Sequence, residues 1–167
     1  MKRLFSFVLV LGLILTGCGS SDDDNDIKDD KEKETFEAMS DDDINSELSD
    51  ISNWVVGDYW NDGLVDIRDY LHNGTDATGK EMDITITLKR YNKAYKKAAK
   101  YDKFIKSLDE DKYGDIKEAW NTMYEEMKIK DEYIQSNDIV AKGDPEFSTD
   151  LFAQYRDYFT DLVYDLE

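Results

Sequence analysis

The sequence predicts an all-α fold, an antiparallel four-helix bundle, and three observations support this class. Proline, which breaks helices, occurs once, at Pro145. Apolar residues after position 43 recur every three or four positions, the spacing of one helix face. Residues 83–88 alternate like a strand, but the helical spacing continues through them for three more turns. We therefore expect helix there too.

The first 17 residues have the three parts of a secretory signal peptide. Lys2 and Arg3 give a positive start, residues 4–15 are almost entirely apolar, and two small residues follow. An apolar run of about 12 residues makes a helix roughly 18 Å long, too short for a hydrocarbon core of about 30 Å. We therefore expect a cleaved signal and not a membrane-spanning helix.

The only cysteine of the chain, Cys18, directly follows this region. With Leu15, Thr16 and Gly17 before it, Cys18 completes a motif that resembles the lipobox of bacterial lipoproteins. An ordinary secretory signal with an incidental cysteine is the alternative. A thiol nucleophile is disfavoured because activation needs a nearby base or positive charge, whereas aspartates follow here. A single cysteine also cannot form an intramolecular disulfide.

The lipobox resemblance implies where in the cell the protein is located. In that family the cysteine thiol carries a diacylglycerol and the signal is cut just before it, so the mature chain would begin at lipidated Cys18. Two acyl chains hold a protein stably on a bilayer, at about 0.8 kcal/mol per buried CH₂. The resemblance thus implies the extracytoplasmic face of the cell membrane, with the covalent diacylglycerol on Cys18 and no other cofactor.

Residues 18–43 are predicted to be a disordered acidic linker. From position 19 to 43 there are twelve acidic residues and three lysines. Such a segment buries too little apolar surface to offset the entropy lost on ordering. About 25 residues of flexible chain have a typical end-to-end distance of roughly 25 to 30 Å. The linker would hold the folded part away from the membrane.

Residues 44–167 are long enough for one domain with a hydrophobic core. A first helix is predicted to stop at Asn73-Gly74, and its apolar face changes phase midway. Its apolar positions are Ile44, Leu48, Ile51 and Val55, then Trp60, Leu64, Ile67 and Leu71.

Three more helices follow. The second is predicted after residues 78–81, Thr-Gly-Lys-Glu, a capping-box pattern, with apolar positions from Ile84 to Ile105. The third carries apolar residues from 116 to 134, and the fourth from 151 to 166. Short connections predict up-down-up-down order. The connection 137–146 is the longest, and therefore the best candidate for a mobile or contact-making loop.

Residues 58–69 suggest an alternative function. They resemble the calcium loop of EF-hand and dockerin modules at Asp58, Asp62, Asp66 and Asp69, with glycine at position 63 for the tight turn. Ca²⁺ takes six to eight oxygen ligands from such a loop. The resemblance therefore implies a calcium-binding surface module.

The same stretch departs from that pattern in ways that favour a helix. The third loop position is Trp60 and not an oxygen donor, and the last is Asp69 and not the longer glutamate. Dockerins also carry two such loops, and this chain has one. The competing interpretation is a helix, or a helix with a kink at Gly63, with its carboxylates outward and Trp60, Leu64 and Ile67 inward.

Composition limits the other chemistries. The formal net charge is -18, and removing Lys2 and Arg3 makes it more negative, so nucleic acid is not an expected partner. His72 is the only histidine, so histidine-based triads and metal clusters lack parts. It falls near the end of the first helix, where a cation suits the helix dipole. The 39 acidic residues leave a hydrolase that uses carboxyl groups as an alternative.

One basic run stands out in this acidic chain. It belongs to the second predicted helix and is either a solvated face or a surface for anionic lipid or wall polymer. Its members are Lys89, Arg90, Lys93, Lys96, Lys97, Lys100 and Lys103.

The sequence as a whole resembles small helical lipoproteins of Gram-positive bacteria. We expect a non-enzymatic, membrane-anchored lipoprotein whose helical domain binds an envelope protein, a peptide or a wall polymer. The calcium module and the hydrolase remain the alternatives. Residues 4–9 also resemble enterococcal peptide pheromones, which are released from lipoprotein signal peptides, although those peptides usually end just before the cysteine.

Overall fold

The computed structural model describes residues 39–166. The predicted signal peptide, the lipobox, Cys18 and most of the acidic linker lie outside the described residues. Every regular element within residues 39–166 is a helix, which confirms the all-α class. The elements are α1 (Asp41–Trp54), η1 (Val55–Val65), α2 (Asp66–Asn73), α3 (Ile84–Ser107), α4 (Glu110–Ser136) and α5 (Asp150–Tyr164).

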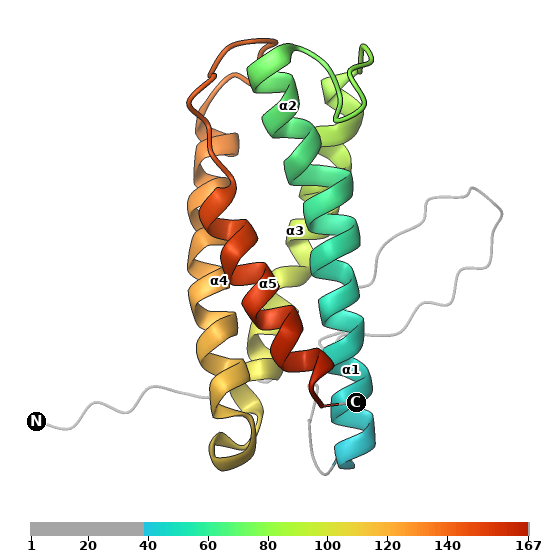
Figure 1. Cartoon of the computed structure of the whole chain (residues 1–167), viewed down its shortest axis with the longest axis vertical. Helices are drawn as coiled ribbons and strands as arrows, with labels where there is room; N and C mark the ends of the chain where they lie inside the picture. The colour runs from blue at the N-terminus through green and yellow to red at the C-terminus, as the bar shows by residue number, and fades with distance from the viewer. Residues whose placement is uncertain (1–38, 167) are drawn as a thin grey trace, which may run out of the picture. The chain divides into compact units, whose positions relative to one another are not determined.

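These elements form four helical columns (Figure 1). The first column is continuous, because α1, η1 and α2 follow one another without a break. Helix α3 packs against η1 and α4, and α5 packs against α4 and α1. Successive columns run in opposite directions (Figure 1), the order of an up-down-up-down bundle.

The first column begins slightly earlier than predicted. Ser40 caps α1: its Oγ accepts from Asp43 N at 3.2 Å, and the Asp43 carboxylate accepts from Ser40 N at 3.3 Å. This capping box satisfies backbone groups that the helix leaves open. The three aspartates at positions 41–43 also suit the positive end of the helix dipole. They are therefore the first turn of the domain and not the end of the linker.

The phase shift in the first column is a π-helical segment. Element η1 has the wider backbone turn in which hydrogen bonds join residues five apart. Val55 and Tyr59 are both fully buried, and so is Leu64 five positions later. The wider turn therefore brings the two apolar sets, which do not share one α-helical face, onto the same core. The π-helical segment, and not a kink at Gly63, therefore accounts for the phase shift.

Aromatic side chains fill the space between η1, α3 and α5. The ring of Tyr59 lies 5.4 Å from that of Tyr91 and 5.1 Å from that of Phe152, centroid to centroid. Gly63 lies against the same cluster, since a Cβ there would approach Tyr91 Cδ2 to 3.3 Å. The π segment and α3 thus meet through an aromatic contact that leaves little room for a side chain at position 63.

Helix α3 starts later than its predicted cap. Asp83 caps it, accepting from Thr85 N at 3.0 Å. The predicted capping box at residues 78–81 is wrong, because Asp76 accepts from Thr78 N at 2.8 Å and from Lys80 N at 3.0 Å. These bonds hold a turn before the helix. Residues 84–88 are helical, as favoured over the strand.

The connection between α4 and α5 covers residues 137–149 and is anchored to the end of α2. Lys142 N donates to Tyr70 O at 3.1 Å, and Asp144 N donates to Leu71 O at 3.3 Å. His72 Nε2 lies 2.7 Å from Phe147 O, to which it can donate. Helix α2 ends as predicted, at Asn73 with Gly74 in the left-handed region at φ 78°. The loop is therefore contact-making.

The Gly63 contact makes a stability prediction. Gly63→Leu places a side chain against Tyr91 without room for it, and overpacking of this kind costs about 1–3 kcal/mol. The matched change, Gly57→Ala, meets no atom within 4 Å. It gains about 0.5–1 kcal/mol from the reduced freedom of the unfolded chain. Urea unfolding measures both, and equal effects would contradict the packing described here.

The buried tyrosines make a pH prediction. Burial raises the pKa of Tyr59 and Tyr91 well above 10, and that of Tyr95 to about 12. Groups with a raised pKa stabilise the fold fully below the unfolded value of about 10 and lose this effect as pH rises through the folded value. The free energy of unfolding should therefore fall from pH 10 upward. A Tyr59→Phe, Tyr91→Phe variant should lose stability less steeply, and identical slopes would refute this assignment.

Candidate functional site

The surface of the described domain includes two grooves of similar volume and a smaller pocket. The groove between α1 and α5 has a volume of about 380 Å³. Most of its lining groups are polar, and Tyr164 is 75% exposed at its edge. The lining residues are Ser49, Ser52, Asn53, Thr160, Asp161, Val163 and Tyr164.

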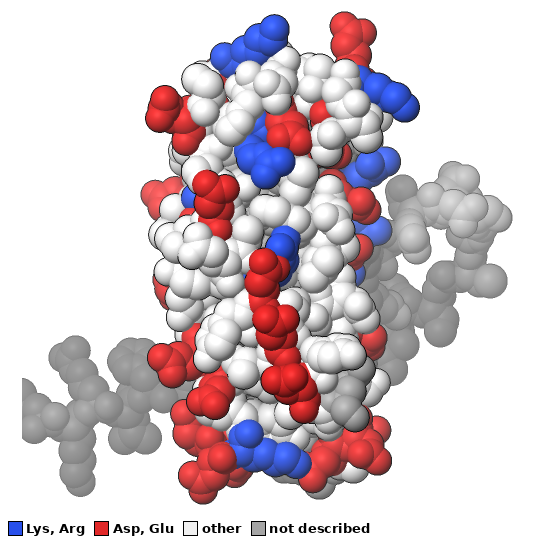
Figure 2. Space-filling model, in the orientation of Figure 1, with Lys and Arg blue, Asp and Glu red and all other residues white. Residues whose placement is uncertain are grey.

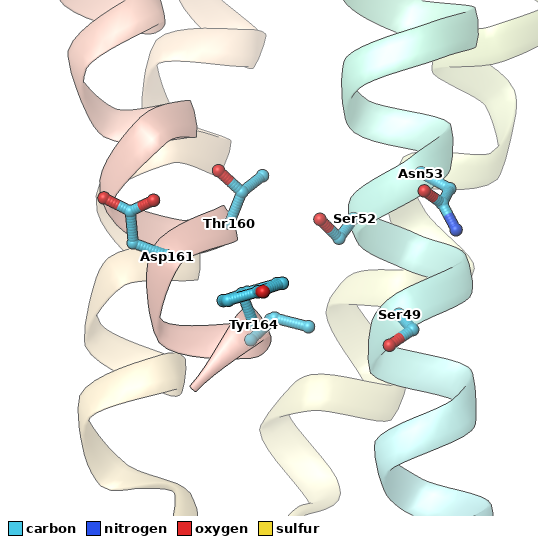
Figure 3. A pocket seen from close by; sticks show the side chains of 7 residues that line it. Ser49, Ser52, Asn53, Thr160, Asp161 and Tyr164 are labelled. Carbon is cyan, nitrogen blue, oxygen red and sulfur yellow. The ribbon is translucent and has the colours of Figure 1, made fainter. Parts of the chain in front are cut away.

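Side chains that carry hydroxyl groups line both sides of this groove. Figure 3 shows Thr160 and Tyr164 on α5 pointing toward Ser52 and Ser49 on α1, whereas Asp161 lies on the outer side of α5. Hydroxyl groups both donate and accept hydrogen bonds, and an exposed tyrosine ring adds a flat apolar surface. This arrangement suits the binding of a polar solute or chain.

The sequence analysis did not single out this groove. Its α1 residues lie three and four positions apart and share one side of the helix, and its α5 residues do the same. That spacing is visible in the sequence, but small polar residues on a helix are ordinarily just solvated. The missing information is that α5 lies opposite α1.

The second pocket, about 230 Å³, lies between η1 and α3 and holds two of the proposed calcium ligands. Asp58 and Asp62 line it together with Arg90, Lys93 and Lys97. Asp58 Oδ2 pairs with Lys97 Nζ at 3.1 Å. Positive side chains thus occupy the place where a calcium loop would hold its cation.

The other two proposed ligands lie elsewhere. Asp66 Oδ1 accepts from Ala77 N at 3.3 Å. Asp69 Oδ1 pairs with Arg68 at 2.9 Å. Within residues 39–166, no three His, Cys, Asp or Glu side chains are grouped to hold a metal ion.

The stretch that resembles a calcium loop is helical in this structure. Residues 58–65 belong to η1 and residues 66–69 to α2, so the four carboxylates lie along a helical column and not around a loop. Leu64 and Ile67 point into the core, as the competing helical interpretation predicted, and Trp60 is half-buried beside Phe152.

The third groove, about 380 Å³, lies between α4 and α5 and is more apolar. Ile129 and Leu151, 55% and 45% exposed, line it with Tyr155. At its base Glu126 is buried, and its carboxylate pairs with Lys130 at 2.7 Å. The pair neutralises the one buried carboxylate of this groove.

Acidic and basic side chains are separated over the surface. Figure 2 shows acidic side chains in a line down the face over α5, where Asp157, Asp161 and Asp165 are exposed at intervals of four. All seven members of the predicted basic run are also exposed, and all lie on α3. The domain therefore has a basic face on α3 and an acidic face on α5.

Two carboxyl groups of the described region have shifted pKa values, and both shifts are downward. Hydrogen bonds from the Lys80 backbone and from Thr78 lower the pKa of Asp76. A hydrogen bond from Tyr133 lowers the pKa of Asp144, and the Tyr133 hydroxyl donates to Asp144 Oδ2 at 2.5 Å. A general acid in a hydrolase needs the opposite shift.

No protein-family model, curated protein or solved structure matches this chain. None of the helices in residues 39–166 has both the length and the apolar character that a membrane crossing needs.

The ion pair of Asp58 makes a prediction about calcium. Trp54 and Trp60 flank Asp58, so their fluorescence reports on this segment. We expect no change in tryptophan fluorescence up to millimolar Ca²⁺, because Lys97 holds Asp58 and the helical backbone presents too few oxygen atoms. A saturable change that disappears in Asp62→Asn would contradict this expectation.

Proposed function

We propose that the protein is a lipid-anchored, extracytoplasmic lipoprotein whose helical domain binds a ligand and does not catalyse a reaction. The observation that carries the anchor is Cys18, preceded by Leu15, Thr16 and Gly17 at the end of a signal-like apolar run. The acidic segment after it would hold the domain outside the bilayer.

The surface of the domain supports the binding half of this proposal. The polar groove between α1 and α5 is lined by hydroxyl-bearing side chains from both helices, among them Ser52 and Thr160. His72, the histidine available for acid–base work, donates to the backbone of the 137–149 loop and does not line the groove. Such a site can hold a polar envelope component, a peptide or a wall polymer, through hydrogen bonds.

The hydrolase is the weaker candidate. A carboxyl general acid needs a raised pKa, which burial or a like charge produces. The shifts at Asp76 and Asp144 go the other way, because each carboxylate accepts hydrogen bonds that favour its charged form. Asp76 and Asp144 also stabilise turns beside helix ends, so both carboxylates have a structural role.

The anchor can be tested at the cysteine. In Cys18→Ser the diacylglycerol cannot attach, so the protein should move from the detergent phase to the aqueous phase on detergent partition of cell membranes. Ser20→Ala, two residues further on, is the matched control and should stay in the detergent phase. The mass of the N-terminal peptide of the wild-type protein should include a diacylglycerol on Cys18. Membrane retention of Cys18→Ser would contradict the proposal.

A further inference from the structure

Charge is distributed unevenly among the helices. Helix α3 carries seven lysines and one arginine but a single acidic residue, Asp102. Each of the other five helical elements in the described region carries more acidic than basic residues. One helix of an acidic domain is thus strongly basic, and this segregation needs an explanation.

The basic residues occupy one side of α3. At 100° per residue, the seven residues fall within an arc of about 140°, and positions 89 to 103 extend over roughly 21 Å. We call this set the α3 basic stripe. Its members, all exposed, are Lys89, Arg90, Lys93, Lys96, Lys97, Lys100 and Lys103.

The stripe is poorly neutralised by the domain itself. Lys97 pairs with Asp58, and Lys100 has an interaction of its own. The other five members form no salt bridge within residues 39–166. Asp102 pairs with Lys106, which lies outside the stripe.

Solvated helix faces usually alternate charge, so that opposite charges meet at intervals of three or four residues. Here like charges meet at those intervals, for example at Lys89, Lys93 and Lys96. Their repulsion disfavours the isolated helix. An extended anionic surface would remove that repulsion along the whole stripe.

We infer that the α3 basic stripe lies against the anionic phospholipid headgroups of the membrane that holds lipidated Cys18. The inference rests on the proposed function, because the anchor supplies the surface. About 20 residues separate Cys18 from Met39. A flexible segment of this length has a typical end-to-end distance of roughly 25 Å, so the anchor keeps the domain at high local concentration beside the bilayer.

The net negative charge of the domain does not oppose this orientation. Electrostatic interactions are screened over about 8 Å at physiological salt, less than the thickness of two packed helices of roughly 10 Å each. The acidic line over α5 in Figure 2 is on a different column from the stripe. A lipid chain combined with a basic surface is a common pair of membrane signals, and each basic side chain near an anionic surface adds to the attraction.

The orientation can be measured with fluorescent labels on the lipidated protein. Cys18 is the only cysteine, so after lipidation a new cysteine takes the label alone. Ala99→Cys reports on α3 beside the stripe, and Gln154→Cys reports on α5; both positions are exposed. The labelled proteins are placed in phosphatidylcholine vesicles that carry a headgroup quencher, with or without phosphatidylglycerol.

With phosphatidylglycerol, the Ala99→Cys label should be quenched several-fold more than the Gln154→Cys label. High salt or omission of phosphatidylglycerol should remove the difference, because the attraction is electrostatic. Equal quenching of the two labels in phosphatidylglycerol vesicles would overturn the inference while leaving the anchor intact. Failure of the protein to float with either kind of vesicle would overturn the proposed function, and the inference with it.

A charge-matched pair of variants tests the stripe itself. Lys93→Gln, Lys96→Gln, Lys103→Gln removes three charges from the stripe and should abolish the preferential quenching at position 99. Lys80→Gln, Lys112→Gln, Lys128→Gln removes three exposed charges from other elements and should keep it. Circular dichroism checks that both variants remain helical. Loss of the preference in both variants alike would also overturn the inference.

Discussion

The contact between the π segment and α3 is the constraint on which the rest of the structure depends. Val55–Val65 must present Tyr59 and Gly63 to Tyr91, and an α-helical backbone would not keep both apolar sets of the first column on one core. Because α3 then packs on α4, and α5 on α4 and α1, the position of every column follows from this contact.

The same packing arranges the surface. When Tyr91, Ala94 and Ala98 face the core, the lysines between them must face outward. The basic stripe is therefore the outer side of the helix that the π segment contacts, and Asp58 and Asp62 of that segment border it. The polar groove between α1 and α5 belongs to another side of the first column. The domain thus presents a basic surface and a hydroxyl-lined groove on different faces, so the proposed membrane contact and the proposed ligand binding would not compete for one surface.

Helix positions followed from the sequence where local pattern and tertiary packing agree. Apolar spacing located the four columns, and Gly74 ended the first because it adopts the left-handed region. The phase shift between Val55 and Trp60 was visible, but its resolution as a π segment was not, since that depends on Tyr91 from another helix. The capping pattern at Thr78 failed because Asp76, two residues earlier, accepts the hydrogen bond from Thr78 N that Glu81 would accept in a capping box.

The candidate site was less predictable for a physical reason. Chemical motifs are recognised by unusual residue types, and Ser52 and Thr160 are ordinary small polar residues until two columns bring them together. Conversely, Asp58 and Asp62 match the calcium pattern only in their spacing along the sequence. In the structure both residues lie on one helical segment, η1. The basic residues of α3 were recognised early because charge, unlike a groove, can be counted along the chain.

The most direct test of the central constraint is the hydrogen-bond register of the first column, measured in solution by NMR couplings across hydrogen bonds. The structure predicts that the amides of residues 60–65 couple to carbonyl groups five residues earlier, and that amides in α1 couple to those four residues earlier. Couplings at an interval of four throughout residues 60–65 would contradict the account, because Tyr59 and Leu64, which are five residues apart and both fully buried, would then no longer share the core face.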